Sequence, residues 1–229
     1  MSDMDRLKQE YEARRQRLPS DEYSLLKRGN LYAYQQRQKA TIQMFSRLNW
    51  KSLAEKAILE VGCGGGGILH EYLGYGVQPD RLHGIEYLAH RVAECHQRFP
   101  DVPVIHGDAQ SLPYPDNHFD LVLQYTVLSS ILDPQVRANV AREMRRVVRP
   151  SGVILWYDFW LNPKNPQTHG IRLDEIRSLF PDSRLLVKKI TLAPPLARRL
   201  VNVSWLACEL LESLTILNSH YLVAIMPTK

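Results

Sequence analysis

Residues 58–67 constrain the fold of this chain more than any other stretch, because a short apolar run ends there in five glycines within six positions. The stretch reads ILEVGCGGGG, and the residues after it predict the start of a helix. A strand, a glycine turn and a helix in this order are typical of a nucleotide-binding α/β unit. Glycine is needed there because the turn is tight, the backbone approaches a ligand, and the helix amides point at that ligand.

The glycine spacing by itself is compatible with two cofactors. Read as Gly-x-Gly-x-x-Gly from Gly62, it agrees with the dinucleotide fingerprint, and Glu86 follows at a distance suitable for an acid that binds a ribose. Read as Gly-x-Gly-x-Gly and preceded by Glu60, it agrees equally well with S-adenosylmethionine binding. The choice between them depends on the sequence downstream.

Length and charge narrow the class of protein. A chain of 229 residues predicts one domain with a sizeable core. The net charge of +5 favours an anionic partner, but the charges are spread along the chain, so nucleic acid is not expected. Cys63, Cys95 and Cys208 are far apart, which predicts free thiols and no metal site.

The sequence predicts neither export nor a membrane span. The first eighteen residues are densely charged and lack the apolar core of a secretory signal. The most apolar stretch, residues 200–217, contains Glu209 and Glu212 and predicts an amphipathic helix. A cytoplasmic protein is therefore expected, and its oligomeric state is left open.

Apolar strands alternate with helices through the middle of the chain. The helix before the fifth strand is the best marked, because Asp133 is placed as an N-cap, Pro134 starts the first turn and Pro150 follows the last. Such alternation predicts a parallel, doubly wound, Rossmann-like α/β sheet. Its five parallel strands are expected at residues 57–61, 82–85, 102–105, 119–124 and 153–158.

The first fifty residues precede this alternation. Residues 1–20 predict a polar helix that forms a solvated or partly ordered arm. Residues 31–48 predict an amphipathic helix, which either lies over the cofactor site as a lid or packs on the sheet edge. We therefore expect an N-terminal helical arm and lid at residues 1–50.

The last part of the chain also departs from the alternation. Strands at 185–192 and 221–225 lack a regular crossover, which predicts an antiparallel edge hairpin that completes a seven-stranded sheet. Residues 193–219 between them predict a helical insertion above the sheet. The expected domain covers residues 51–229.

Five motifs occur in order and at regular spacing between residues 56 and 159. They are LEVGCGGG at 59–66, GIE at 84–86, GDAxxLP at 107–113, FDLV at 119–122 and EMxRVxRPxG at 143–152. With these motifs the chain resembles the class I S-adenosylmethionine-dependent methyltransferases of the large type 11 group. The resemblance implies S-adenosylmethionine as cofactor and an antiparallel last strand, so a dinucleotide oxidoreductase is not expected.

The resemblance implies roles for residues around the cofactor. Glu86 would accept from the ribose hydroxyls, Asp108 would accept from the adenine amine, and the Ala109 N–H would bond the ring. The tail of the cofactor would pass the glycine turn, with Tyr32, Tyr34 and Arg37 of the lid helix within reach of its carboxylate. The expected cofactor-binding residues are Glu60, Gly62, Cys63, Gly64, Glu86, Tyr87, Asp108, Ala109, Gln124 and Tyr34.

Methyl transfer is an in-line displacement, in which the protein mainly supplies proximity and alignment. A general base is needed only where the nucleophile keeps its proton at neutral pH. Asp158, His169 and His220 are the candidate catalytic bases, although each is also compatible with a structural role as a cap or a packed histidine. No carboxylate cluster suits Ca²⁺ or Mg²⁺, so metal-assisted chemistry is not expected.

The acceptor is less constrained than the cofactor. The strand end at residues 124–127 lacks the signature of enzymes that methylate planar amino groups, and the aromatic residues at 156–160 suit a small, partly apolar molecule. We therefore expect methyl transfer to an O or N atom, and less readily to a C atom, of a small biosynthetic metabolite. Methyl transfer to RNA or protein, and cofactor binding without catalysis, remain as alternatives.

Overall fold

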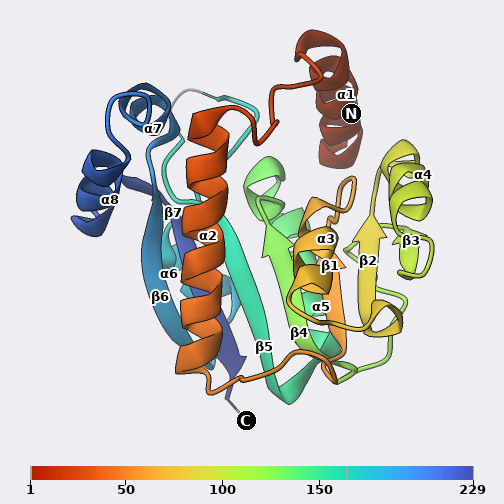
Figure 1. Ribbon diagram of the computed structural model, residues 1–229. Helices are drawn as coiled ribbons and strands as arrows, with labels where there is room; N and C mark the ends of the chain where they lie inside the picture. The colour runs from red at the N-terminus through yellow and green to blue at the C-terminus, as the bar shows by residue number, and fades with distance from the viewer. Residues whose placement is uncertain (1, 163–164, 229) are drawn as a thin grey trace.

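The computed structural model describes residues 2–162 and 165–228, and one seven-stranded sheet runs through it (Figure 1). The strand order is β3-β2-β1-β4-β5-β7-β6, and β7 runs antiparallel to both of its neighbours. Helices cover the two faces of the sheet. The fold class expected from the sequence, a mostly parallel Rossmann-like sheet with an antiparallel last strand, is confirmed.

Five parallel strands form the larger part of the sheet. β1 lies between β2 and β4, and Val61 at its end is opposite Ile85 and Gln124. The carboxyl ends of these strands meet at one edge, where open α/β sheets bind ligands. The strands are β1 (Ile58–Val61), β2 (Leu82–Glu86), β3 (Val104–His106), β4 (Phe119–Tyr125) and β5 (Val148–Phe159).

The helices between these strands begin where the sequence predicts. The Asp133 side chain accepts from the backbone N–H groups of Gln135 and Val136, so it is the expected N-cap of α5. The glycine turn leads into α3 through Gly66, whose left-handed φ of +80° is natural for glycine. The helices are α3 (Gly67–Gly74), α4 (Ala89–Arg98), α5 (Pro134–Val147) and α6 (Leu173–Leu179), with short 3-10 turns η1 (Pro79–Arg81) and η2 (Leu128–Ser130).

The core lies on both sides of the sheet, because successive strand residues point to opposite faces. Leu155 packs on the side that carries α2, α3 and α4, whereas its neighbour Trp156 packs with α5 and α6 on the other side. Both side chains are fully buried. The parallel strands are therefore apolar on both faces, which explains their continuous hydrophobic runs.

The predicted edge hairpin is present at the C-terminal side of the sheet. β6 (Ser183–Leu192) pairs antiparallel with β7 (Asn218–Pro227), and β7 pairs with β5. The insertion between the two strands forms two short helices, α7 (Pro194–Leu200) and α8 (Trp205–Ser213). They pack on α2, with Tyr32 buried between them.

The two N-terminal helices, α1 (Asp3–Arg17) and α2 (Arg28–Arg47), lie near the expected positions. The expectation that residues 1–20 form a merely solvated arm is wrong. The Asp3 carboxylate accepts from the backbone N–H groups of Leu132 and Asp133, at 2.8 and 3.1 Å, and Arg6 donates to the Ser130 carbonyl at 2.7 Å. Charged side chains attach α1 to the loop before α5, so polarity here does not mean exposure. Within the described ranges, no helix is long and apolar enough to cross a membrane.

Candidate active site

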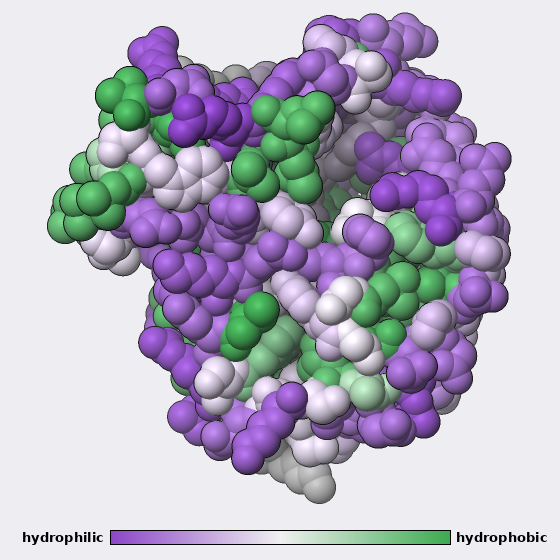
Figure 2. Space-filling model, in the orientation of Figure 1, coloured by the Kyte–Doolittle hydropathy of each residue, from purple (hydrophilic) through white to green (hydrophobic). Residues whose placement is uncertain are grey.

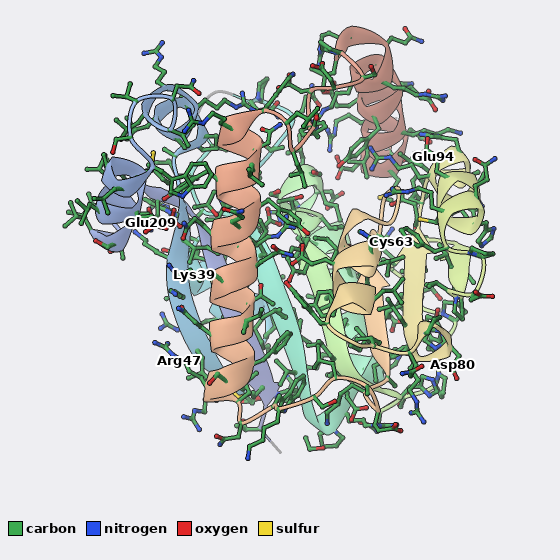
Figure 3. All side chains as sticks on the ribbon, viewed as in Figure 1. Lys39, Arg47, Cys63, Asp80, Glu94 and Glu209 are labelled. Carbon is green, nitrogen blue, oxygen red and sulfur yellow. The ribbon has the colours of Figure 1, made fainter. Side chains whose placement is uncertain are left out.

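A cavity of about 680 Å³ lies at the carboxyl ends of β1, β2 and β4. The glycine turn lies on one side of it, and residues from α1 and α2 on the other. Figure 2 shows the surface hollowed beside α1, and Figure 3 labels Cys63 in the turn between β1 and α3. Of the predicted cofactor-binding residues, those that line the cavity are Tyr34, Glu60, Gly62, Cys63, Gly64, Glu86, Tyr87, Asp108 and Ala109.

The glycine turn adopts a backbone that few other residues tolerate. Gly62 and Gly64 have φ angles of +69° and +54°. A Cβ on Gly62 would lie 2.6 Å from Cγ2 of Val127, and a Cβ on Gly64 would lie 3.3 Å from Nη1 of Arg91. The close approach of Gly62 to Val127 and the left-handed φ at both positions therefore require glycine. The turn brings the backbone to the wall of the cavity without an intervening side chain.

Glu86 fixes the shape of the turn from the end of β2. Its Oε2 accepts the Gly64 N–H at 2.8 Å, and its Oε1 accepts the Leu88 N–H at 2.9 Å. Each carboxylate oxygen has a second lone pair, so both oxygens can still accept from a ligand hydroxyl. Asp108, on the same rim, is oriented by the backbone N–H of Gln110 at 2.9 Å.

Glu60 is a buried carboxylate at the wall of the cavity. Its residue surface is 2% exposed, and its Oε2 has no hydrogen-bond partner among the described residues. Burial, with Cys95 and Glu86 nearby, raises the pKa of the Glu60 carboxyl well above its usual value, although Arg37 opposes the rise. A buried carboxylate without a partner costs free energy, which a cationic ligand in this cavity would recover.

Arg37 supplies the opposite charge from α2. Its Nη2 donates to Glu71 Oε2 at 2.7 Å, and its guanidinium lies 5.4 to 5.8 Å from the ring centroids of Tyr34, Tyr125 and Tyr157. Its Nε is buried and has no acceptor among the described residues. Glu60 and Arg37, which both line the cavity, therefore each have one buried polar atom without a partner among the described residues.

Two residues that were expected near the cofactor make hydrogen bonds to other parts of the protein instead. Gln124 is fully buried, and its Oε1 accepts the Val127 N–H at 3.1 Å, which is the geometry of a loop cap. Tyr32 donates its hydroxyl to Glu212 of α8 at 2.7 Å and so belongs to the contact between α2 and the insertion. Tyr34 and Arg37, on the same helix, are the residues that reach the cavity.

The acidic candidate base, Asp158, is enclosed by donors. It is fully buried at the end of β5 and accepts from the backbone N–H groups of Ser129 and Phe159, at 3.0 and 2.8 Å. Burial raises its pKa to about 6, because the charged form loses water that these bonds only partly replace. Asp158 thus caps the 3-10 turn η2 and does not line the cavity described above.

The two histidine candidates have different surroundings. His169 pairs with Glu175 at 2.9 Å and is partly exposed. His220 is buried and stacks on Tyr157 with ring centroids 4.7 Å apart, and its Nδ1 lies 2.9 Å from Ser219 Oγ. Burial, and secondarily Arg37, lower the pKa of His220 to about 3, so it is neutral at pH 7 and a weak base.

A second cavity of about 740 Å³ adjoins the first and shares Tyr11, Thr126 and Tyr157 with it. Its walls are unequally charged, because the carboxylate side chain that lines it is Glu94 of α4, seen in Figure 3 on the side of α4 near α1. The cationic side chains that line it are Arg14, Arg15, Arg91 and Arg198. An anionic ligand is therefore favoured over a cationic one.

The sequence reasoning missed several residues of these cavities. Arg91 lies 4.5 Å from the centroid of the Tyr11 ring and so joins α4 to α1 across the first cavity. His90 lines the second cavity, with its Nδ1 3.6 Å from Glu12 Oε1. Thr126 has a left-handed φ of +56°, an uncommon backbone for threonine and a mark of strain at the end of β4. In the sequence, the position of Thr126 directly after a predicted strand was the signal that could have identified it.

Among the described residues, no group of three or more histidines, cysteines and carboxylates could hold a metal ion.

Residues 59–156 match the family model described as "Methyltransferase domain". A "Fatty-acid O-methyltransferase" from Mycolicibacterium smegmatis is 38% identical over 105 residues, which are 45% of this chain and 37% of that protein. A "Phthiotriol/phenolphthiotriol dimycocerosates methyltransferase" from Mycobacterium tuberculosis is 34% identical over 130 residues, 56% of this chain and 46% of that protein. The chain thus spans less than half the length of these relatives.

Solved structures share the fold at low sequence identity. A SAM-dependent methyltransferase from Archaeoglobus fulgidus superposes with a TM-score of 0.57 at 15% identity, covering 85% of this chain and 98% of that one. The [4+2]-cyclase SpnF superposes with a TM-score of 0.54 at 19% identity, covering 84% of each chain. The fold alone therefore does not determine the reaction. The resemblance to class I S-adenosylmethionine-dependent methyltransferases is confirmed, and S-adenosylmethionine is the cofactor that it implies.

Proposed function

Because residues 59–156 match a methyltransferase domain, we propose that this chain transfers the methyl group of S-adenosylmethionine to a small-molecule acceptor. The observation that carries the proposal is a pair of side chains that line the first cavity, Glu60 and Arg37, each with one buried polar atom, Oε2 and Nε, that has no partner among the described residues. An amino-acid tail carries an ammonium and a carboxylate, which match an acceptor and a donor of these charges. Because of this match, the residues that the sequence predicts around the cofactor tail fit S-adenosylmethionine.

Each wall of the first cavity has a role toward this cofactor. Glu60 holds the ammonium, Arg37 holds the carboxylate, and the glycine turn from Gly62 lets the tail pass. Glu86 accepts from the ribose hydroxyls, and Asp108 accepts from the adenine amine. When bound, S-adenosylmethionine supplies a methyl group activated by its sulfonium. The protein contributes alignment, which in a well-oriented site accounts for roughly 7–11 kcal/mol of the barrier.

We propose further that the acceptor atom is a carboxylate oxygen, which becomes a methyl ester. A carboxylate is already ionised at neutral pH, so it needs no general base. This agrees with the geometry of the predicted bases, because Asp158 is occupied by backbone donors and His220 is a weak base. The four arginines of the second cavity supply charge for a carboxylate. A relative named as a fatty-acid O-methyltransferase supports the same class of acceptor.

One observation favours a second acceptor class. His90 lines the second cavity and faces Glu12, and a histidine paired with a carboxylate can serve as a base for a hydroxyl nucleophile. Transfer to a hydroxyl would then depend on His90 and on pH, whereas transfer to a carboxylate would depend on neither. Methylation of RNA or protein, or cofactor binding without turnover, are the remaining alternatives.

The cofactor is tested by isothermal titration calorimetry with S-adenosylmethionine, and turnover by transfer of labelled methyl groups. The acceptors are linear carboxylic acids with the alcohols and amines of the same chain length. We expect a methyl ester from an acid and no product from the matching alcohol or amine. Binding without any labelled product from acids, alcohols, amines, RNA or protein would contradict methyl transfer.

The acceptor class is tested with His90→Gln and with a pH series on the same panel. We expect the rate with an acid to change by less than about threefold and to stay level from pH 6 to pH 9, because the acid is ionised throughout. Asp158→Asn is the control, and we expect it to lower the melting temperature while its turnover, measured well below that temperature, stays close to normal. A methyl ether whose formation requires His90 would establish the hydroxyl class instead.

A further inference from the structure

The helix α8 presents Leu206 and Leu210 to solvent and its two glutamates to the protein, while Leu211 packs against the cluster around Tyr32. Glu212 accepts from the Tyr32 hydroxyl at 2.7 Å and from the Thr191 N–H at 2.8 Å, and Glu209 accepts from Gln36 at 3.4 Å. Figure 3 labels Glu209 on this helix beside α2. A surface helix usually turns its charges outward, whereas α8 turns both glutamates inward. The outward face of α8 is therefore unusually apolar.

The exposed apolar residues continue beyond α8. We call the α8 patch the large aliphatic residues of this segment that are more than half exposed, namely Val203 (83%), Leu206 (65%), Leu210 (60%), Leu214 (59%) and Ile216 (78%). The spacing of four residues between Leu206, Leu210 and Leu214 places these three along one side of α8 and its C-cap. Figure 2 shows hydrophobic residues gathered at the left, over α7 and α8. Contiguous exposed apolar surface of this kind marks an interaction site.

Positive charge borders the α8 patch on the side of α7. Arg198 and Arg199 lie in the last turn of α7 and are exposed, and Arg28 at the start of α2 is exposed near Arg198. Arg198 pairs with Glu22 at 3.5 Å, so Arg199 and Arg28 carry most of the positive charge of this border. Leu26, in the same bordering segment, is 95% exposed. The carboxylates of α8 face inward, so the outward charge of the insertion is positive.

We infer that the α8 patch docks on an anionic lipid surface, such as a bilayer that contains phosphatidylglycerol. Aliphatic side chains bury in the boundary between headgroups and acyl chains, and neighbouring arginines bind the anionic headgroups. Arg198 also lines the second cavity, so that cavity opens at the border of the same surface. A docked chain therefore receives an amphiphilic acceptor directly from the lipid layer.

The charge of the border selects a lipid surface over a second copy of this chain. A symmetric dimer through the α8 patch would bring two sets of arginines together at one interface, and like charges there oppose association. Anionic headgroups instead neutralise these arginines and reward the burial of the leucines. Binding should then weaken with added salt, because the attraction is partly electrostatic.

Co-sedimentation with vesicles tests the docking surface with the full chain. The vesicles are phosphatidylcholine alone, or phosphatidylcholine with phosphatidylglycerol at a ratio of seven to three. The variants are Leu206→Glu/Leu210→Glu, Arg199→Glu, and the control Ile42→Glu, which changes an exposed residue of α2 outside the patch. We expect binding to the anionic vesicles, an affinity at least about tenfold lower in the double leucine variant, and little change in the control.

Circular dichroism melting shows whether each variant is folded, and sedimentation velocity gives its oligomeric state. Docking is refuted if the full chain does not sediment with anionic vesicles, or if the leucine variant binds as well as the parent. A dimer of the full chain that becomes a monomer in the leucine variant would assign the patch to a second copy. Vesicle binding requires neither cofactor nor acceptor, so its failure is separate from a failure of methyl transfer.

Discussion

Exchanging Glu60 for glutamine should stabilise the protein and weaken its ligand binding at the same time. Glu60 is buried in β1, its Oε2 has no partner among the described residues, and burial raises its pKa well above the usual value. The folded protein therefore holds a proton that the unfolded chain releases above its own pKa near 4.5. Between these two pKa values, each rise in pH lowers the free energy of unfolding.

The size of the effect follows from the same linkage. One unit of pKa difference corresponds to about 1.4 kcal/mol, so at pH 7 the destabilisation by Glu60 reaches at most about 3.4 kcal/mol, starting from its unfolded value of 4.5. Glutamine has nearly the same shape and removes this term. For a chain of this length about 1 kcal/mol changes the melting temperature by roughly 2–4 °C. We expect Glu60→Gln to raise the melting temperature by several degrees at pH 7.

Ligand binding should change in the opposite direction. Glu60 can release its proton when an ammonium binds beside it, whereas glutamine cannot become charged, and a hydrogen bond to a charged group is worth roughly 1.5–3 kcal/mol. We expect the Kd for S-adenosylmethionine to rise by at least about tenfold. The assays are differential scanning calorimetry from pH 4.5 to pH 8 without ligand, and titration calorimetry with S-adenosylmethionine.

Glu71→Gln is the matched control. Glu71 is equally buried, but it is paired with Arg37 and with the Tyr75 hydroxyl, each at 2.7 Å. Its loss leaves a buried cation without a partner, so this exchange should lower the melting temperature. The gain from Glu60→Gln should shrink as the pH falls toward 4.5 and vanish only below it, where both states are protonated. A melting temperature that falls at pH 7, or an unchanged Kd, would refute the reasoning about Glu60.

Three further changes test the rest of the first cavity. Arg37→Ala removes the cation of α2, so the Kd for S-adenosylmethionine should rise at least about tenfold in titration calorimetry, and a Kd within twofold of the parent would remove Arg37 from the site. Gly62→Ala adds a Cβ 2.6 Å from Val127 Cγ2 at a φ of +69°, so a chain with a normal circular dichroism spectrum should no longer bind. Deletion of residues 1–20 removes α1 from the wall of the cavity, and fluorescence titration should give at least about fivefold weaker binding; normal binding would make α1 dispensable.

Patterns over short stretches of sequence were enough to predict the sheet and one side of the first cavity. The glycine turn and the acid at the end of β2 are neighbours in a βαβ unit, so Gly62, Gly64 and Glu86 could be brought together from their spacing along the chain. The N-cap Asp133 likewise satisfies amides two and three residues away. These contacts join residues that are close together along the chain, so the residue types and their spacing predict them directly.

The far side of the cavity could not be predicted in this way. Arg6 contacts Ser130 and Gln167 across more than a hundred residues, and no periodicity in α1 records these partners. The sequence of a charged helix predicts that the helix is solvated, whether its charges face water or distant carbonyl groups. The candidate bases show the same limit, because whether Asp158 faces a ligand or two backbone amides depends on the fold of η2, not on its position at a strand end.

The packing of α2 has a consequence for the order in which this chain folds. α2 comes before the first strand, yet it packs on α7, β6 and β7, which are the last elements of the chain. Contacts of such sequence separation form late, since a long loop must close before they stabilise anything. During synthesis the glycine turn and the pair of Arg37 with Glu71 of α3 can therefore form before α2 gains its contacts with the C-terminal elements. Truncated chains that lack β6 and β7 would keep the contacts of α2 with α3 but lose those with the hairpin, so the α2 wall of the first cavity is fully packed only when the C-terminal hairpin has docked.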